Sequence, residues 1–222
     1  DCFSFFASAP LGCNHPALDN PDFIKKIGKV AVNKASNSDN YTVEMAEFVD
    51  TFGKIDVPES FEHLFFVSGG SLAVENGLKV SFDWKVRKNI VGGKGELGSQ
   101  VIHFKDAFHG RTGYTLPMTN TFDPNKTRYF PILNWPRVVN PKVSFPLDDE
   151  NLKKVEEIEK KSIDQINKAV SENPNDIACL ILEPIQGEGG DNHFRPEFFQ
   201  ELRRICDEND IIFMLDEVQS GL

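Results

Sequence analysis

The sequence predicts an α/β fold, in which a mostly parallel sheet lies between two layers of helices. Residues 211–215 are five consecutive apolar side chains, a run typical of a strand buried on both faces of a parallel sheet. A second apolar run at 179–184 precedes it, and a helical pattern at 195–210 lies between the two runs. Because a strand, a helix and a strand at this spacing form a βαβ unit, the sheet is expected to be parallel.

Two helices are predicted near the N-terminus. Asn20 can cap a helix that begins with Pro21, because proline is favoured at the first helical position. This helix is expected at 21–34, and a second helix is expected at 42–54 after the polar stretch SNSDNYT.

The central part of the chain alternates between strands and helices, with one irregular excursion. The predicted elements are strands at 64–67 and 100–104, helices at 71–89 and 149–172, and a proline-containing excursion at 119–148. Gly77 lies inside the first of these helices, where it costs about 1 kcal/mol relative to alanine. We therefore expect a close neighbour at Gly77 that leaves room only for a small residue.

The composition favours a protein that binds small molecules. The 222 residues carry a formal net charge of -10 and a pI near 5.0, which argues against a nucleic-acid-binding surface. No run of about 18 apolar residues occurs, so no membrane-spanning helix is expected. Cys179 and Cys206 lie in core patterns and the cysteines show no zinc-binding spacing, so we expect reduced thiols in a cytoplasmic protein without a metal site.

The turn Ser68-Gly69-Gly70-Ser71, between a predicted strand and a predicted helix, is a candidate phosphate site. Glycines let backbone N–H groups approach a ligand, and a helix N-terminus offers unpaired donors to an anion. The turn lacks the ending of a Walker A loop and the spacing of a GxGxxG motif. An ordinary structural turn is the alternative interpretation.

A second candidate group follows the strand at 100–104. Phe108 can stack on a flat ring, and Arg111 can grip a carboxylate through two parallel hydrogen bonds. Core packing for Phe108 and an ordinary surface position for Arg111 are the alternatives. His109 is expected to be a structural histidine, because its spacing from His103 does not fit a helical metal pair.

Three acidic residues are expected at the same edge of the sheet. Glu183 and Asp216 end neighbouring strands, and Glu188 lies on a glycine-rich loop. Burying a carboxylate at the end of a strand costs free energy unless a cation lies beside it. Ligands of open α/β sheets bind at the carboxyl ends of the strands. Asp216 can therefore hold a cation such as a protonated pyridine ring, although a helix cap or a solvated loop acid explains it equally well. Glu188 can gate a pocket or can be a solvent-exposed charge.

Together these groups match the needs of pyridoxal 5'-phosphate. The turn at Gly70 can anchor the phosphate and Phe108 can hold the ring. Asp216 can keep the ring nitrogen protonated, so that the ring acts as an electron sink.

Four segments resemble the motifs of class III, pyridoxal-phosphate-dependent aminotransferases, in the order and spacing of that family. They are SGGSLAVENGLK, FKDAFHGRTGYTL, LILEPIQGEGG and FMLDEVQSG. The resemblance implies a fold-type-I large domain at 56–222, a three-layer α/β/α structure that is incomplete. It also implies that residues 1–55 belong to the small domain and to dimer contacts.

The resemblance implies a role for each candidate residue. The cofactor-binding residues would be Gly70, Ser71, Phe108, Asp216 and Gln219, the catalytic residues Asp216 and Glu183, and the substrate-binding residues Arg111 and Glu188. Gly70 and Ser71 would hold the phosphate, and Gln219 would reach the ring hydroxyl. Arg111 would hold the substrate α-carboxylate, and Glu188 would be the movable acid that lets one site accept a basic amine and then 2-oxoglutarate. Residues 8–11 would border the substrate entrance.

The longer wording of the motifs, such as GGSLAVENGLKVSFDWK, is most similar to family members that move the ε-amino group of L-lysine to 2-oxoglutarate as homodimers. Ornithine, acetylornithine and 4-aminobutyrate aminotransferases are alternatives within the family. A non-catalytic module that binds pyridoxal phosphate and a nucleotide-binding enzyme are alternatives outside it. The family's catalytic lysine follows LDEVQSG, and no lysine of these residues matches it, so the chain alone is expected not to transaminate.

Overall fold

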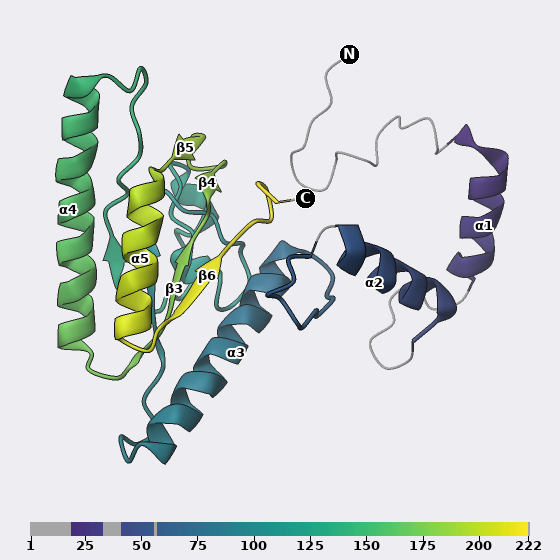
Figure 1. Cartoon of the computed structure of the whole chain (residues 1–222), viewed down its shortest axis with the longest axis horizontal. Coiled ribbons are helices and arrows are strands. Elements are labelled where there is room, and N and C mark those ends of the chain that lie inside the picture. The colour runs from purple at the N-terminus through teal and green to yellow at the C-terminus, as the bar shows by residue number, and fades with distance from the viewer. Residues whose placement is uncertain (1–18, 33–40, 56, 222) are drawn as a thin grey trace. The chain divides into compact units, whose positions relative to one another are not determined.

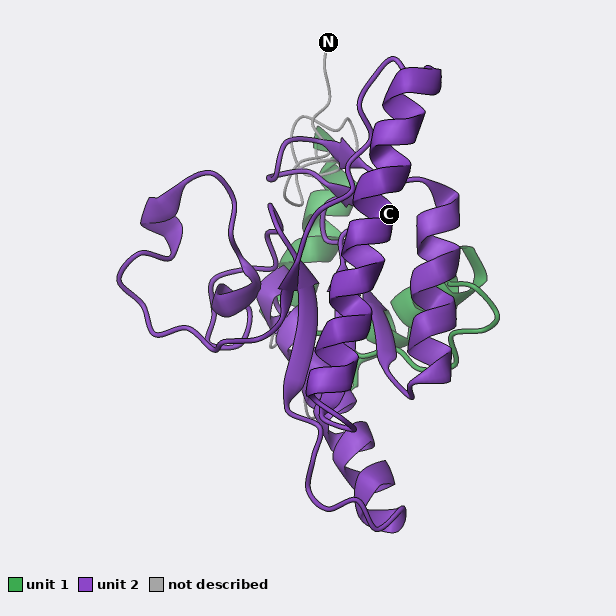
Figure 2. Ribbon diagram, turned by 90° about the vertical axis from the view of Figure 1, so that its left-hand side faces the viewer, with its two compact units in different colours: residues 1–67, 222 green, residues 68–221 purple. Residues whose placement is uncertain are grey.

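The computed structural model describes residues 19–32, 41–55 and 57–221, which divide into two compact units (Figure 1). The first unit runs to Val67, and the second comprises Ser68–Gly221 (Figure 2). The predicted boundary at residue 55, and the role of residues 1–55 in a small domain and in dimer contacts, stay predictions.

The first unit contains two helices. α1 (Pro21–Ala31) and α2 (Val43–Ile55) confirm both predicted helices. The Asn20 side chain caps α1 by accepting the backbone N–H groups of Asp22 and Phe23, at 2.9 and 3.2 Å. No residue of α1 or α2 is buried.

The strand predicted at 64–67 is wrong. A strand is stable only when its backbone N–H and C=O groups bond to a neighbouring strand, and none of the described strands pairs with this segment. Instead, the ring of Phe66 packs on α2, with its centroid 5.4 Å from that of Phe48 and 6.4 Å from that of Phe52. The apolar character of Phe66 therefore reflects packing on a helix, which the sequence pattern does not distinguish from a strand.

The second unit is built on a four-stranded parallel sheet. Its strands are β1 (Gln100–Phe104), β2 (Arg137–Val138), β3 (Ile177–Leu182) and β6 (Ile212–Leu215), in the order β2-β1-β3-β6. A separate antiparallel pair consists of β4 (Ile185–Gln186) and β5 (Asn192–His193). The strands predicted at 100–104, 179–184 and 211–215 are confirmed, although β3 ends before Glu183. β2 is not predicted from the sequence, because a strand of two residues has no periodic pattern of apolar side chains.

Helices cover both faces of this sheet (Figure 1). They are α3 (Gly70–Val91), α4 (Asp149–Glu172) and α5 (Pro196–Glu208). Leu180 of β3 packs in the cluster that contains α4 and α5, and its neighbours Cys179 and Ile181 pack in the cluster that contains α3, because successive side chains of a strand point to opposite faces. The three-layer α/β/α fold is thus confirmed. None of the helices in the described ranges is both long and apolar enough to cross a bilayer.

β6 is less buried than its sequence predicts. Ile212, Phe213 and Met214 are half-buried, and Leu215 is 44% exposed. β6 is the last strand in the order of the described sheet, so it has a strand neighbour on one side only. Phe213 packs on the cluster that contains α4 and α5, and Met214 packs on the cluster that contains α3, so both faces of β6 are covered, but only in part.

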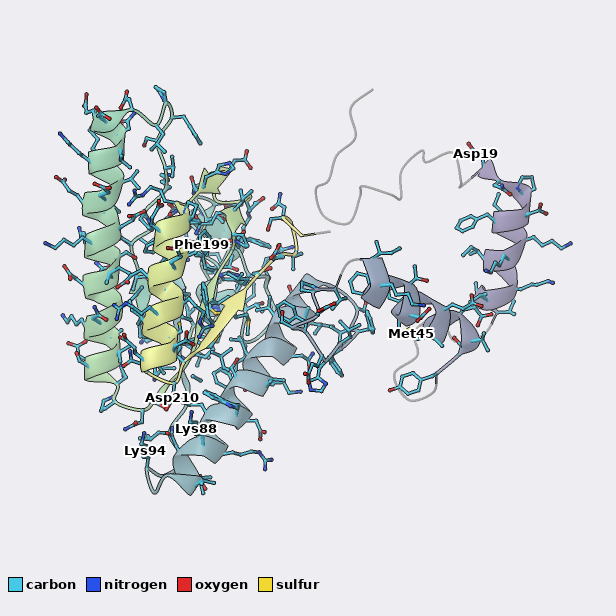
Figure 3. The ribbon with its side chains drawn as sticks, viewed as in Figure 1. Asp19, Met45, Lys88, Lys94, Phe199 and Asp210 are labelled. Atoms are coloured by element: carbon cyan, nitrogen blue, oxygen red, sulfur yellow. The ribbon has the colours of Figure 1, made fainter. Side chains whose placement is uncertain are left out.

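Contacts at both ends of β6 determine how α3 crosses the sheet. The Lys85 ammonium donates to the Asp210 carbonyl oxygen at 2.7 Å. Lys88, which lies near Asp210 in Figure 3, pairs with the Asp210 carboxylate at 2.6 Å. A Cβ added at Gly77 would lie 2.8 Å from Cε of Met214, so the expected close neighbour is confirmed. The C-terminal half of α3 therefore contacts the residues before β6, and its N-terminus is directed to the carboxyl ends of the strands.

Candidate active site

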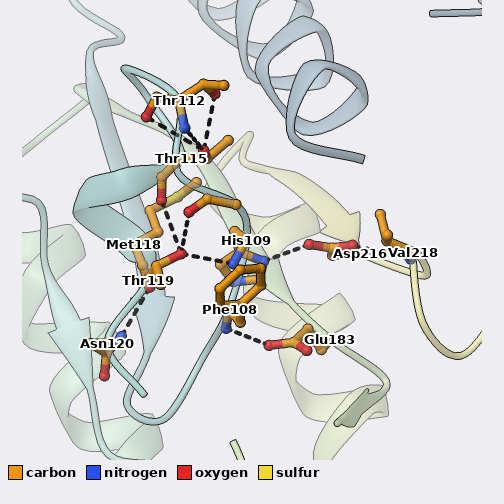
Figure 4. Close-up of polar contacts among 11 residues, drawn as sticks. Phe108, His109, Thr112, Thr115, Met118, Thr119, Asn120, Glu183, Asp216 and Val218 are labelled. Carbon is orange, nitrogen blue, oxygen red and sulfur yellow. Dashed lines mark hydrogen bonds and ion pairs between the residues drawn. The ribbon is translucent and has the colours of Figure 1, made fainter. Parts of the chain in front are cut away.

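The carboxyl ends of β1, β3 and β6 converge on one group of side chains. Phe108 lies on the loop after β1, whereas Glu183 and Asp216 directly follow β3 and β6. Figure 4 shows Glu183 joined to Phe108, and Asp216 joined to His109, the residue next to Phe108. The structure therefore brings together the candidates that the sequence places at strand ends.

Asp216 is buried and held by two partners. Its Oδ2 lies 2.7 Å from Nδ1 of His109, and the two side chains are 3% and 0% exposed. Its Oδ1 accepts the N–H of Val218 at 3.2 Å. Nε2 of His109 is buried and has no hydrogen-bond partner among the described residues. His109 therefore positions the Asp216 carboxylate, a structural role whose partner the sequence analysis does not specify.

Glu183 lies beside Phe108 and is also buried. Its Oε1 accepts the Phe108 N–H at 2.8 Å, and the residue is 4% exposed. Burial raises the pKa of Glu183 to about 7, and the nearby His109 opposes the shift. A carboxyl group with such a pKa can hold or release a proton near neutral pH.

The backbone after Phe108 is fixed by Thr119, a residue that the sequence motifs do not single out. The Thr119 hydroxyl oxygen accepts the His109 N–H at 3.0 Å, and the hydroxyl donates to the Gly110 carbonyl at 2.6 Å (Figure 4). Thr119 therefore holds the backbone of His109 and Gly110 in place.

The N-terminus of α3 meets the same loops. Gly110 has a φ of 108°, and a Cβ added there would lie 2.0 Å from Oγ of Ser71. A Cβ added at Gly70 would lie 2.6 Å from Cγ1 of Val218. No side chain of the described residues caps this end of α3, so its first N–H groups can receive an anion.

Two further candidates, Glu188 and Gln219, lie on the turn between β4 and β5 or against it. A Cβ at Gly187 would lie 2.2 Å from Oε1 of Gln219, so the Gln219 side chain rests on this loop. Glu188 forms a close ion pair with Lys126, whose Nζ lies 5.2 Å from the centroid of the Phe108 ring. Lys126 is another residue that the sequence motifs do not single out.

Arg111 makes no hydrogen bond or ion pair with Phe108, Glu183 or Asp216 in the described part of the chain. It is exposed, and it makes no ion pair or hydrogen bond within the part of the chain that the structure describes. Residues 8–11, which were expected to border the substrate entrance, lie outside the described residues.

The arrangement suits a flat ring that carries a phosphate and a cationic nitrogen. The open end of α3 can take the phosphate. Phe108 offers a face for stacking, and Asp216 offers a buried carboxylate to the nitrogen.

The profile of the family described as "Aminotransferase class-III" matches residues 1–222. L-lysine-epsilon aminotransferases of Mycobacterium tuberculosis and Streptomyces clavuligerus are 49% and 47% identical to the chain, covering all of it and 49% and 48% of their own lengths. A 4-aminobutyrate aminotransferase of Emericella nidulans is 28% identical, with coverage of the whole chain and 48% of that protein.

Solved structures agree with these similarities. A lysine aminotransferase from M. tuberculosis superposes with a TM-score of 0.92 and 49% identity, over 100% of this chain and 50% of that chain. A transaminase from Virgibacillus has a TM-score of 0.65 at 20% identity, over 86% of this chain and 39% of that chain, which shows the shared fold alone. The chain spans about half the length of the curated relatives it matches. It belongs to the class III aminotransferase family.

Proposed function

We propose that this protein is a transaminase that moves the ε-amino group of L-lysine to 2-oxoglutarate, giving 2-aminoadipate 6-semialdehyde and glutamate. The observation that carries the proposal is a difference in identity. L-lysine-epsilon aminotransferases are 47–49% identical to the chain, whereas 4-aminobutyrate aminotransferases are 28–29% identical. Both groups align with the whole chain, so coverage does not explain the difference.

The cofactor of class III aminotransferases is pyridoxal 5'-phosphate, and the described residues fit it. Glycine at positions 70 and 110 lets the N-terminus of α3, the loop after β1 and the segment after β6 approach one another, since a Cβ at either position would collide with a neighbour. In the proposal Gly70 and Ser71 hold the phosphate, Phe108 stacks on the ring, and Gln219 binds the ring hydroxyl. When bound, the cofactor supplies an electron sink.

Two buried carboxyl groups would carry the chemistry that this chain contributes. Asp216, oriented by His109, would keep the ring nitrogen protonated. Glu183, beside Phe108, has a pKa of about 7 and would hold or release a proton at the site. We further propose that the catalytic lysine lies in the half of the relatives' length that this chain does not cover, so that the 222 residues alone do not transaminate.

Two charged residues are the proposed contacts with substrate. The exposed guanidinium of Arg111 suits the α-carboxylate of lysine, because arginine binds carboxylates through two parallel hydrogen bonds. Glu188 would move between the lysine and 2-oxoglutarate half-reactions. The enzyme would act as a cytoplasmic homodimer, without a membrane or nucleic-acid partner.

Steady-state kinetics of the protein expressed from its full reading frame test the proposal. With 2-oxoglutarate as acceptor, kcat/KM for lysine should exceed that for ornithine by at least about tenfold, the discrimination that one methylene group usually gives. A preference for ornithine, acetylornithine or 4-aminobutyrate would overturn the substrate assignment. No turnover with any amine, together with a cofactor absorbance that borohydride does not alter, would favour a non-catalytic binding module.

A further inference from the structure

Arg111 lies between two residues whose backbone groups are held by threonine hydroxyl groups. On one side, the Gly110 carbonyl oxygen accepts a hydrogen bond from the Thr119 hydroxyl at 2.6 Å. On the other side, the Thr112 N–H donates to Oγ1 of Thr115 at 2.9 Å, and the hydroxyl oxygens of these two threonines lie 3.0 Å apart (Figure 4). The backbone on both sides of Arg111 is therefore fixed, although its side chain makes no hydrogen bond or ion pair among the described residues.

Thr115 and Thr119 flank one buried element. This element is the short 3-10 helix η2 (Leu116–Met118), which has Thr115 before its first residue and Thr119 after its last, and all three of its residues are buried. Thr115 and Thr119 are themselves 0% and 2% exposed. Because a buried hydroxyl group without a partner costs free energy, each hydroxyl favours the backbone position that gives it one.

Glu75 of α3 holds the far end of the same turn. Its Oε1 accepts the Tyr114 N–H at 2.9 Å. The Leu116 N–H donates to the Thr112 carbonyl oxygen, also at 2.9 Å. The turn that carries Arg111 is thus anchored to both α3 and η2.

We infer that Thr115 and Thr119 are positioning residues for Arg111, which fix the direction from which its side chain reaches the α-carboxylate of the substrate. A mobile turn loses conformational freedom when a ligand is gripped, and that loss weakens binding. Holding the backbone of both neighbours beforehand removes this part of the loss. The two parallel hydrogen bonds from a guanidinium to a carboxylate also demand a defined approach. The inference rests on the proposed function, which assigns the α-carboxylate of lysine to Arg111.

Binding of L-norleucine tests this inference without turnover, because norleucine has the α-carboxylate of lysine but no ε-amino group. Its dissociation constant is measured by calorimetry on the cofactor-loaded, full-length protein. Thr115→Val nearly keeps the shape of the side chain and removes its hydroxyl, so it should weaken binding about tenfold, the size of one hydrogen bond to a charged group. Thr115→Ser retains the hydroxyl and should stay within about threefold of the wild type.

Arg111→Met separates positioning from general damage to the site. Added to Arg111→Met, Thr115→Val should weaken norleucine binding by less than about twofold, because the guanidinium that it positions is already gone. Thr119→Val should behave in the same way in both backgrounds, so it decides the question if Thr115→Val fails to fold. Equal losses with and without Arg111 would overturn the inference.

Ser162→Ala is the matched control. The Ser162 hydroxyl of α4 is also buried and also donates to a backbone carbonyl, that of Val139 at 2.9 Å. Its removal should change the affinity for norleucine by less than about twofold. A loss as large as that of Thr115→Val would show that any buried hydroxyl has this effect, and would also overturn the inference.

Two measurements separate this inference from the proposed function. Absence of lysine-dependent transamination by the wild type would refute the proposed function. Norleucine binding that is absent from the wild type, or that Arg111→Met does not weaken, would refute the substrate role of Arg111 and the inference with it. Binding that depends on Arg111 but not on the Thr115 and Thr119 hydroxyl groups would refute only the inference.

Discussion

Glu183 should make the stability of the protein depend on pH. The residue is 4% exposed, and burial raises its pKa from 4.5 to about 7. Between these values the folded protein binds more protons than the unfolded chain does. Stability changes with pH in proportion to the protons bound by the unfolded state minus those bound by the folded state, so it falls as pH rises through this window.

The size of the effect follows from the separation of the two pKa values. The separation between 4.5 and about 7 corresponds to roughly 3 to 4 kcal/mol of unfolding free energy, at about 1.4 kcal/mol per pKa unit. Glu183→Gln removes the titrating group and nearly preserves its shape. Relative to this variant, the cofactor-free wild-type protein should lose roughly 2 to 3 kcal/mol between pH 5 and pH 8, measured by urea unfolding.

The control is Glu150→Gln, which changes a carboxylate whose side chain is 80% exposed. Because surface ion pairs contribute little, this variant should differ from the wild type by less than about 0.5 kcal/mol at every pH. A difference between wild type and Glu183→Gln that stays constant across the pH range would refute the reasoning, since it would mean that Glu183 does not titrate between the two pKa values.

Two further substitutions test contacts of the same site by denaturant unfolding. His109→Phe leaves the Asp216 carboxylate buried without its ring partner and should cost about 3 kcal/mol, whereas Lys154→Met breaks an exposed pair and should cost less than about 1 kcal/mol. Gly110→Ala should cost about 2 kcal/mol or more because its φ is 108° and its Cβ would overlap a neighbouring side chain. Gly53→Ala is its control, because a Cβ added at Gly53 of α2 meets no neighbour. This variant should be more stable than the wild type by up to about 1 kcal/mol. Equal changes in unfolding free energy for His109→Phe and Lys154→Met, or for Gly110→Ala and Gly53→Ala, would contradict these contacts.

Elements whose signals are local could be predicted from the sequence. The helix predicted at 149–172 matches α4 at both ends, because its apolar periodicity and its flanking polar residues lie within the segment. The strand predicted at 64–67 and the burial predicted for 211–215 depend on which elements lie alongside. A local pattern does not carry that information, so Phe66 packs on a helix and Leu215 is exposed.

The same distinction holds at the site. Phe108, Glu183 and Asp216 could be placed at one edge of the sheet, because the carboxyl ends of parallel strands meet there. The pairing of His109 with Asp216 could not be predicted, because it depends on the order of β1, β3 and β6 in the sheet. Lys126 ends a short 3-10 helix (Pro124–Lys126) within the predicted excursion, and three residues have no periodicity that indicates which way a side chain points.

The central claim is that Gly70, Phe108 and Asp216 bind one molecule of pyridoxal 5'-phosphate. A crystal structure of the full-length protein with this coenzyme tests the claim most directly. We predict that the phosphate lies at the N-terminus of α3, that the ring stacks on Phe108, and that the ring nitrogen lies within hydrogen-bonding distance of the Asp216 carboxylate. Electron density for the coenzyme elsewhere, or a ring nitrogen that faces away from Asp216, would contradict it.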